Sequence, residues 1–178
     1  MKMWLRYRNL GTAFTDLGDP SKAIEFFEQV LAMDRKIGNR QGEVSALIGL
    51  GSAHSKLGDS RKAVGFLEQS VVLAHGIADR RGESNAIRNL GLTWTISGET
   101  RKAIECFERS MVLAHEIGDS LAEGEGLFNM ALALDILAER SKAITHAEAA
   151  LSIFEALESH YAADVRDILS KWRSQASP

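Results

Sequence analysis

The hydrophobic and polar positions of this chain recur with a period of 40 residues. Within each period, apolar residues follow one another three and four positions apart, which is the spacing of an amphipathic helix and not the alternation of a strand. Two pairs mark the period most clearly. A Leu-Gly pair occupies 10–11, 50–51, 90–91 and, as Met-Ala, 130–131, and a Lys-Ala pair occupies 22–23, 62–63, 102–103 and 142–143. The pattern predicts an all-α stacked array whose units bury a face only against their neighbours.

Short polar segments divide each period into two predicted helices. In the first unit, Gly18 suits the left-handed position that ends a helix, Asp19 suits the cap of the next helix, and Pro20 suits its first turn. Equivalent turns return at 58–60 and 98–100. Between units, 38–39, 78–79 and 118–119 are predicted to end one helix and cap the next, and Glu43, Glu83 and Glu123 follow early in that next helix.

The small residues of the two helices are predicted to face each other, because close helix axes need small side chains. The expected pairs are Gly11 with Ala23, Gly51 with Ala63, Gly91 with Ala103 and Ala131 with Ala143. Larger residues fill the rest of the interior. Three positions after the small residue stand Phe14, Trp94 and Leu134, and His54 is the odd member of this set.

These residues together resemble the tetratricopeptide repeat, in which Leu-Gly is followed by an aromatic residue, and an alanine on the second helix by a phenylalanine four positions later. The period of 40 residues exceeds the usual length of about 34, and the proline that ends the second helix is missing. The units are similar to repeats of Leu-Gly-Asn scaffolds and to C-terminal repeats of bacterial signalling ATPases. The resemblance implies an α-solenoid of four helix-turn-helix repeats in a right-handed superhelix, at about 1–38, 39–78, 79–118 and 119–158.

The two ends of the array differ. Residues 159–175 carry an apolar stripe opposite a charged face and are predicted to form a capping helix, followed by a short tail at 176–178. The N-terminal end has no such cap, so Trp4 and Leu5 are expected on an unprotected surface. Either the chain is part of a larger protein or this end docks onto a partner, such as a second copy of the chain.

The inner, concave face is where arrays of this kind are expected to bind, and the first helix of each pair lines it. A side-chain amide offers a donor and an acceptor together, which matches a peptide backbone. The resemblance implies this role for Asn9, Asn89 and Asn129, although duplication of one ancestral asparagine would leave the same row. Gly49 interrupts it. The candidate contact residues are Arg8, Asn9, Thr12, Asn85, Arg88, Asn89, Glu125 and Asn129.

Composition and motifs narrow the function further. The 178 residues carry a formal net charge of −3, with acids and bases interspersed, which argues against nucleic-acid binding. Apolar runs fall short of the roughly 20 residues that span a bilayer, and the first residues do not resemble an export signal. Cys106, the single cysteine, is expected to be a small buried hydrophobic residue.

No sequence motif indicates a catalytic, nucleotide-binding or metal site. Nucleotide-binding glycine motifs are missing, and His75 and His115, one period apart, lack further residues to complete a metal site. We therefore expect a cytoplasmic, non-catalytic scaffold or sensor module without a cofactor, which binds an extended protein or peptide segment. The alternative is a structural module that associates with itself, as a dimer or a stack, through the uncapped N-terminal end.

Overall fold

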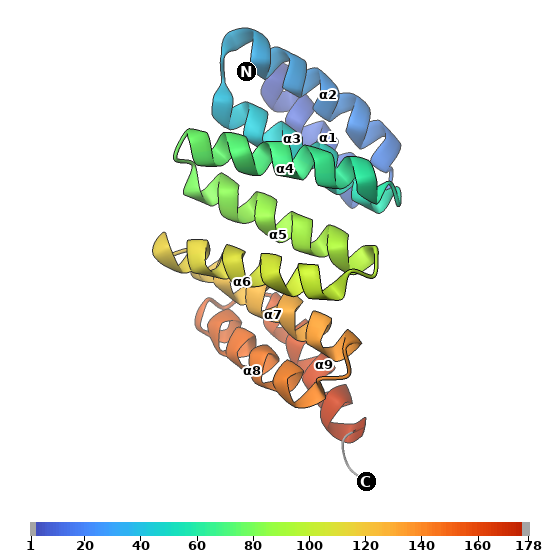
Figure 1. Cartoon of the computed structure of the whole chain (residues 1–178), viewed down its shortest axis with the longest axis vertical. Coiled ribbons are helices and arrows are strands. Elements are labelled where there is room, and N and C mark those ends of the chain that lie inside the picture. Colours follow the sequence, from blue (N-terminus) through green and yellow to red (C-terminus); the bar gives the residue numbers. More distant parts are fainter. Residues whose placement is uncertain (1–2, 176–178) are drawn as a thin grey trace.

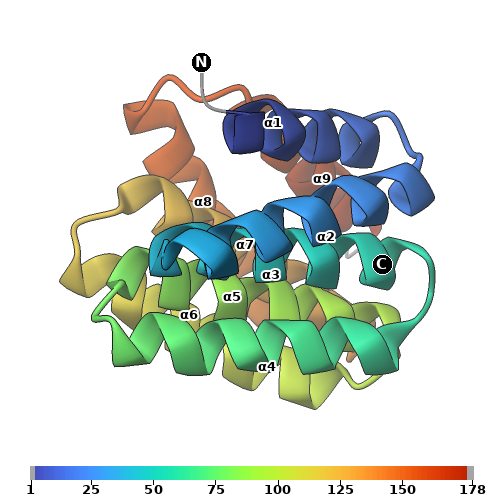
Figure 2. The same ribbon diagram turned by 90° about the horizontal axis from the view of Figure 1, so that it is seen from above.

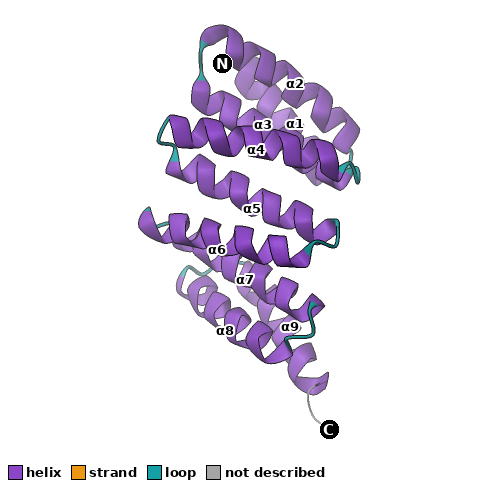
Figure 3. Ribbon diagram, viewed as in Figure 1, coloured by secondary structure: helices purple, strands orange, loops and turns teal. Residues whose placement is uncertain are grey.

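The computed structural model describes residues 3–175, and every regular element in this range is an α-helix (Figure 1, Figure 3). In chain order the helices are α1 (Met3–Asp16), α2 (Pro20–Ile37), α3 (Arg40–Lys56), α4 (Ser60–Gly76), α5 (Arg80–Ile96), α6 (Thr100–Glu116), α7 (Ser120–Ile136), α8 (Arg140–Ala156) and α9 (Tyr161–Gln175). The predicted all-α repeat solenoid is confirmed.

Each helix packs mainly against the helices that precede and follow it in the chain. The odd-numbered helices also contact one another, α1 with α3, α3 with α5 and α5 with α7. They therefore form one continuous inner row, with the even-numbered helices outside it. Seen from above, successive helix pairs are rotated about the axis of the stack (Figure 2).

The turns end helices at the predicted residues. Gly18 has a φ of 76°, in the left-handed region, and the Asp19 carboxylate accepts a hydrogen bond from the Lys22 N–H at 3.2 Å. Between units, Gly38 has a φ of 71° and Ala78 a φ of 57°. The following caps Asn39, Asp79 and Asp119 each accept from a backbone N–H three residues on.

The glycines that begin the repeat pattern on the inner helices lie closest to large side chains of the outer helices. A Cβ on Gly91 would lie 2.5 Å from Cε1 of Phe107, and one on Gly11 would lie 2.9 Å from Cε1 of Phe27. Each of these rings comes from the outer helix, one turn after the expected alanine. The predicted alanine partners Ala23, Ala63, Ala103 and Ala143 are themselves fully buried.

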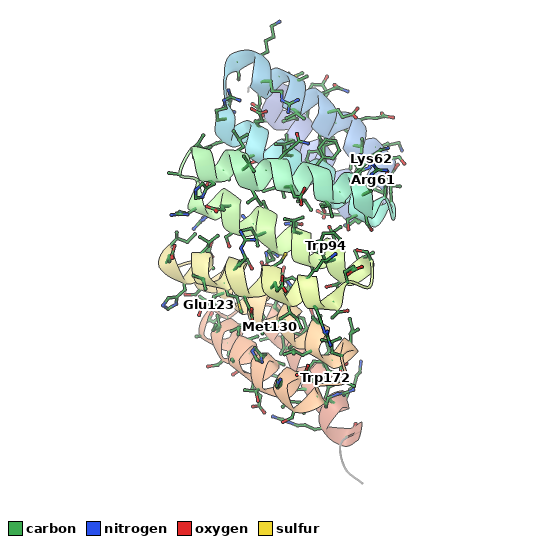
Figure 4. The ribbon with its side chains drawn as sticks, in the orientation of Figure 1. Arg61, Lys62, Trp94, Glu123, Met130 and Trp172 are labelled. Atoms are coloured by element: carbon green, nitrogen blue, oxygen red, sulfur yellow. The ribbon has the colours of Figure 1, made fainter. Side chains whose placement is uncertain are left out.

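Helix α9 closes the C-terminal end of the stack against α8. Its side chains Ala162, Val165, Leu169 and Trp172 are buried in the same core cluster as Phe154 of α8. The Arg140 guanidinium lies 5.3 Å from the centre of the Trp172 ring (Figure 4). The apolar stripe expected at 159–175 thus faces the array.

Candidate functional site

The inner row of helices forms a hollow surface with two adjoining pockets. The first lies between α1 and α3 and has a volume of about 370 Å³. Its lining comprises Arg8, Thr12, Thr15, Asp16, Phe27, Ser45, Ile48, Gly49, Ser52, Lys56 and Asn89. We call it the α1–α3 pocket. Three of its charged or polar lining residues, Arg8, Thr12 and Asn89, belong to the candidate set from the sequence.

The second pocket lies between α3 and α5 and has a volume of about 220 Å³. Its lining comprises Ser52, Ser55, Lys56, Asn89, Leu92, Thr93, Thr95 and Ile96. We call it the α3–α5 pocket. Ser52, Lys56 and Asn89 line both pockets, so the two hollows form one groove that crosses three inner helices.

The gap in the asparagine row at Gly49 has a steric cause. A Cβ on Gly49 would lie 2.6 Å from Cε1 of Phe27, whose ring is buried beneath the groove. No side chain fits there without displacing the ring. Gly49 is therefore part of the floor of the α1–α3 pocket.

The predicted asparagines differ in their surroundings. Asn9 is exposed, whereas Asn89 and Asn129 are half-buried. The Asn89 amide nitrogen donates to the backbone carbonyl of Asn85 at 2.8 Å, one turn earlier on α5. This bond holds the Asn89 side chain at the boundary between the two pockets and leaves its amide oxygen as a potential acceptor.

The predicted charged residues of α5 and α7 bind each other. Arg88 forms an ion pair of 2.9 Å with Glu125, and both side chains are about four-fifths buried, with 21% and 20% exposed. A second Arg88 nitrogen donates to the Asn85 side-chain oxygen at 3.4 Å. The pair links two inner helices and neutralises both charges on this part of the face.

Three further residues on this face, Lys56, Ile96 and Ile136, escaped the sequence analysis. Lys56, at the end of α3, donates to the Thr15 carbonyl of α1 at 3.0 Å and so bridges two units. Ile96 on α5 and Ile136 on α7 are 61% and 60% exposed. The sequence pattern could have identified these residues, since they lie one turn beyond Ser52, Leu92 and Leu132 on the same side of their helices.

The N-terminal end presents an apolar surface. Leu10 is 42% exposed, whereas the equivalent Leu50 is fully buried and Leu90 is 8% exposed. Leu5 is half-buried, and the side chain of Trp4 lies outside the part of the chain that the structure describes. Of the two self-association candidates, Trp4 and Leu5, the structure therefore describes the side chain of Leu5, and Leu10 is a further exposed apolar residue of α1.

Burial shifts the pKa of two residues of the interior, His54 and Cys106. The His54 ring stacks on Phe66 at 5.4 Å, and burial, followed by repulsion from Lys62, lowers its pKa. Its Nδ1 is buried and lies 4.0 Å from the Asp59 carboxylate, too far for a hydrogen bond. Burial raises the pKa of the Cys106 thiol, as expected for a packed hydrophobic side chain.

The junctions between units carry recurring ion pairs. The buried Glu43 carboxylate binds Arg35 at 2.7 Å and Arg40 at 2.9 Å, and the Arg35 contact is the main cause of its lowered pKa.

In the next unit, a histidine takes the place of Arg35, and His75 lies 3.1 Å from Glu83. His115 repeats this arrangement with Glu123, which explains the spacing of the two histidines without a metal. Within residues 3–175, no group of three or more potential ligands is assembled for a metal ion.

A larger hollow, of about 850 Å³, lies between one side of α4 and residues Arg40, Glu43 and Leu47 of α3, and we call it the outer hollow. Its lining comes from the Glu43 junction and from one side of α4, including Gly65, Val72 and Gly76. The candidate residues of the concave face are all elsewhere. Over the described range, no helix is both long and apolar enough to cross a membrane.

Comparisons with known proteins agree with this geometry. The model of the tetratricopeptide repeat family matches residues 4–73, and the search of curated protein sequences found no match. The later units repeat the matched pattern with the same period.

Several solved structures are similar in fold. The tetratricopeptide-like repeats of a Podospora anserina protein assigned as a kinesin light chain are 18% identical, with a TM-score of 0.74 over 98% of this chain and 88% of that chain. RapI, in its apo form, is 14% identical, with a TM-score of 0.79 over 97% of this chain and 48% of that chain.

A signal transduction ATPase with numerous domains and a tetratricopeptide repeat sensor, from Pyrococcus horikoshii, is 18% identical. Its TM-score is 0.79 over 100% of this chain and 28% of that chain. This chain therefore spans about half of RapI and about a quarter of the ATPase.

Proposed function

We propose that this chain, whose residues 4–73 match the model of the tetratricopeptide repeat family, is a non-catalytic scaffold or sensor module that holds an extended segment of another protein on its concave face. The proposed contact residues are Arg8, Asn9, Thr12, Asn85, Arg88, Asn89, Glu125 and Asn129. Of these, Arg88 and Glu125 act mainly by fixing α5 against α7, because they bind each other.

The observation that carries this proposal is the continuous groove across α1, α3 and α5. Its two pockets adjoin at Asn89, which offers an amide to a peptide backbone while each pocket accepts a side chain. An extended segment lying across the inner helices uses both features at once. A small-molecule site would not need an amide at the boundary of two open pockets.

The test uses random linear peptides displayed on phage and selected against the whole chain. Alanine at Asn9, Asn89 and Asn129 together is expected to weaken binding of the selected peptides at least about tenfold, because each lost amide contact contributes up to about 1 kcal/mol. Circular dichroism should stay unchanged, since alanine favours the helix. The control is Val72→Ser, at an exposed position in the outer hollow. Equal weakening by both variants, or none by the triple variant, would reject the concave face as the binding surface.

A sensor role draws support from the fold that this chain shares with the repeat sensor of the Pyrococcus horikoshii ATPase. In that reading, a bound segment changes how the array contacts a neighbouring domain or protein. A cytoplasmic location, expected from the sequence, stays a prediction.

A second candidate function is self-association through the N-terminal end, and the exposure of Leu10 favours it. Light scattering across a concentration series tests this function. Dimers or larger assemblies that Leu10→Asp abolishes, and that Leu57→Asp at a turn leaves intact, would support it. A monomer at all concentrations would exclude it.

A further inference from the structure

The side chains on the inner helices change from polar to apolar along the array. The comparison is clearest five residues after the Gly or Ala that follows the Leu or Met of each repeat. The first two units carry Asp16 and Lys56 there, and the last two carry Ile96 and Ile136. One turn earlier the same change occurs, from Thr12 and Ser52 to Leu92 and Leu132. The polar part and the apolar part meet at α5.

The polar part has an excess of positive charge. The charged residues that line the α1–α3 pocket are Arg8, Lys56 and Asp16, two cations and one anion. A lysine ammonium has three N–H donors. Lys56 uses one of them on the Thr15 carbonyl, so the other two can bind a ligand. The contact with Thr15 fixes the position of the ammonium, so that a ligand carboxylate meets a charge that is already in place.

The middle of the groove contains an unusual hydroxyl. Ser55 lines the α3–α5 pocket and is 6% exposed, and its Oγ has no hydrogen-bond partner among the described residues. The equivalent hydroxyls of Thr15 and Thr95 donate to carbonyls one turn earlier, at 2.8 and 3.0 Å. The pocket thus combines an unused polar atom with the apolar walls of Leu92 and Ile96.

Beyond the groove, the next inner helix, α7, presents an apolar surface. Phe128 and Leu132 on α7 are half-buried against the core, and Ile136 extends the same row with 60% of its surface exposed. The charges of α7 on this face are paired, Glu125 with Arg88 at 2.9 Å and Asp135 with Arg140 at 2.7 Å, so the surface favours an apolar ligand residue.

We propose that the occupant is an extended segment of another protein that carries an acidic side chain in the α1–α3 pocket, a small residue such as Thr or Val in the α3–α5 pocket, and a larger apolar residue against Leu132 and Ile136. This inference rests on the proposed function. Neighbouring helix axes lie about 10 Å apart and an extended chain advances about 3.3 Å per residue. The three recognised residues are therefore spaced about three positions apart.

The experiment is display of random 12-residue linear peptides, presented internally so that none has a free terminal carboxylate, against the whole chain. The selected sequences are expected to share Asp or Glu, then a small residue, then a larger apolar one, at intervals of about three. For the best peptide, Lys56→Gln should reduce affinity about tenfold, as for loss of one charge-assisted bond. The effect should vanish when the peptide carries Asn or Gln in place of its acid. Lys36→Gln, at an exposed lysine on the outer helix α2, is the matched control.

Several outcomes would overturn the inference. Selected peptides without the acidic residue, or an equal effect of Lys56→Gln on acidic and neutral peptides, would refute it while the asparagine variant still supported the proposed function. Selected residues three and four apart around a helix would refute the extended occupant. Self-association of the free chain that the selected peptide disrupts would indicate a second copy as the occupant. Failure to select any peptide that depends on the asparagines would overturn both proposals.

Discussion

The buried hydroxyls of this array have different roles, and Ser55 differs from the rest. Ser70 donates to the Val44 carbonyl at 3.1 Å and Ser84 to the Ser110 carbonyl at 2.9 Å, each between the two helices of one unit. Ser55 makes no such bond among residues 3–175. A buried hydroxyl without a partner lowers stability, so Ser55 does not strengthen the fold.

Alanine substitutions at these serines are expected to have opposite consequences. Ser55→Ala should leave the free energy of unfolding unchanged or slightly higher, because it removes an unpaired polar atom. Ser70→Ala should lower it by about 1–3 kcal/mol, because the Val44 carbonyl loses its donor. Urea denaturation measures both. An equal loss of stability in the two variants would show that the Ser55 hydroxyl is satisfied in solution.

His54 is predicted to make stability depend on pH. Its pKa is lowered by burial and by Lys62, so below about 6.5, the ordinary value, the unfolded chain takes up the proton more readily than the folded chain. The free energy of unfolding should therefore fall as the pH falls from 7 to 5.5. His54→Phe, which keeps the contact with Phe66, should remove this dependence. Urea denaturation at the two pH values measures it, and an unchanged slope in the variant would contradict the assignment.

At the scale of helices, the sequence predicts the turns better than the packing. Gly18, Asp19 and Pro20 were predictable because capping depends on a few adjacent residues. The close approach of Phe27 to Gly11 was not predictable from the sequence. The period fixes the rotation of a helix about its axis but not its position along that axis relative to the neighbouring helix. A shift of one turn along the axis of the outer helix places the Phe27 ring, and not Ala23, nearest to Gly11.

Two glycine substitutions test the packing of the helices. Gly49→Ala should lower the free energy of unfolding by about 1–3 kcal/mol, because the new methyl group collides with the buried Phe27 ring. Gly65→Ala should raise it by about 0.5–1 kcal/mol, because its Cβ meets open space and alanine favours the helix. Thermal unfolding followed by circular dichroism measures both shifts. A stabilised Gly49→Ala variant would mean that Phe27 does not occupy this position.

At the scale of the whole molecule, the period predicts which side chains share one side of the inner helices but not which of them bind each other. The row of Asn9, Asn89 and Asn129 follows from phase alone. The Arg88 and Glu125 pair and the bridge from Lys56 to Thr15 depend on the distance between inner helices, which local patterns do not encode. The gap at Gly49 also required the structure, since its cause is a ring 22 residues earlier in the chain.

The central claim is that the inner row of helices is the binding surface. The most direct measurement is the change in backbone amide chemical shifts of the isotope-labelled chain when a display-selected peptide is added. The largest changes are expected at Gly49, Ser52, Lys56 and Asn89, along the groove. Changes centred on Gly65, Val72 and Gly76 of α4 would place the ligand in the outer hollow and contradict the account.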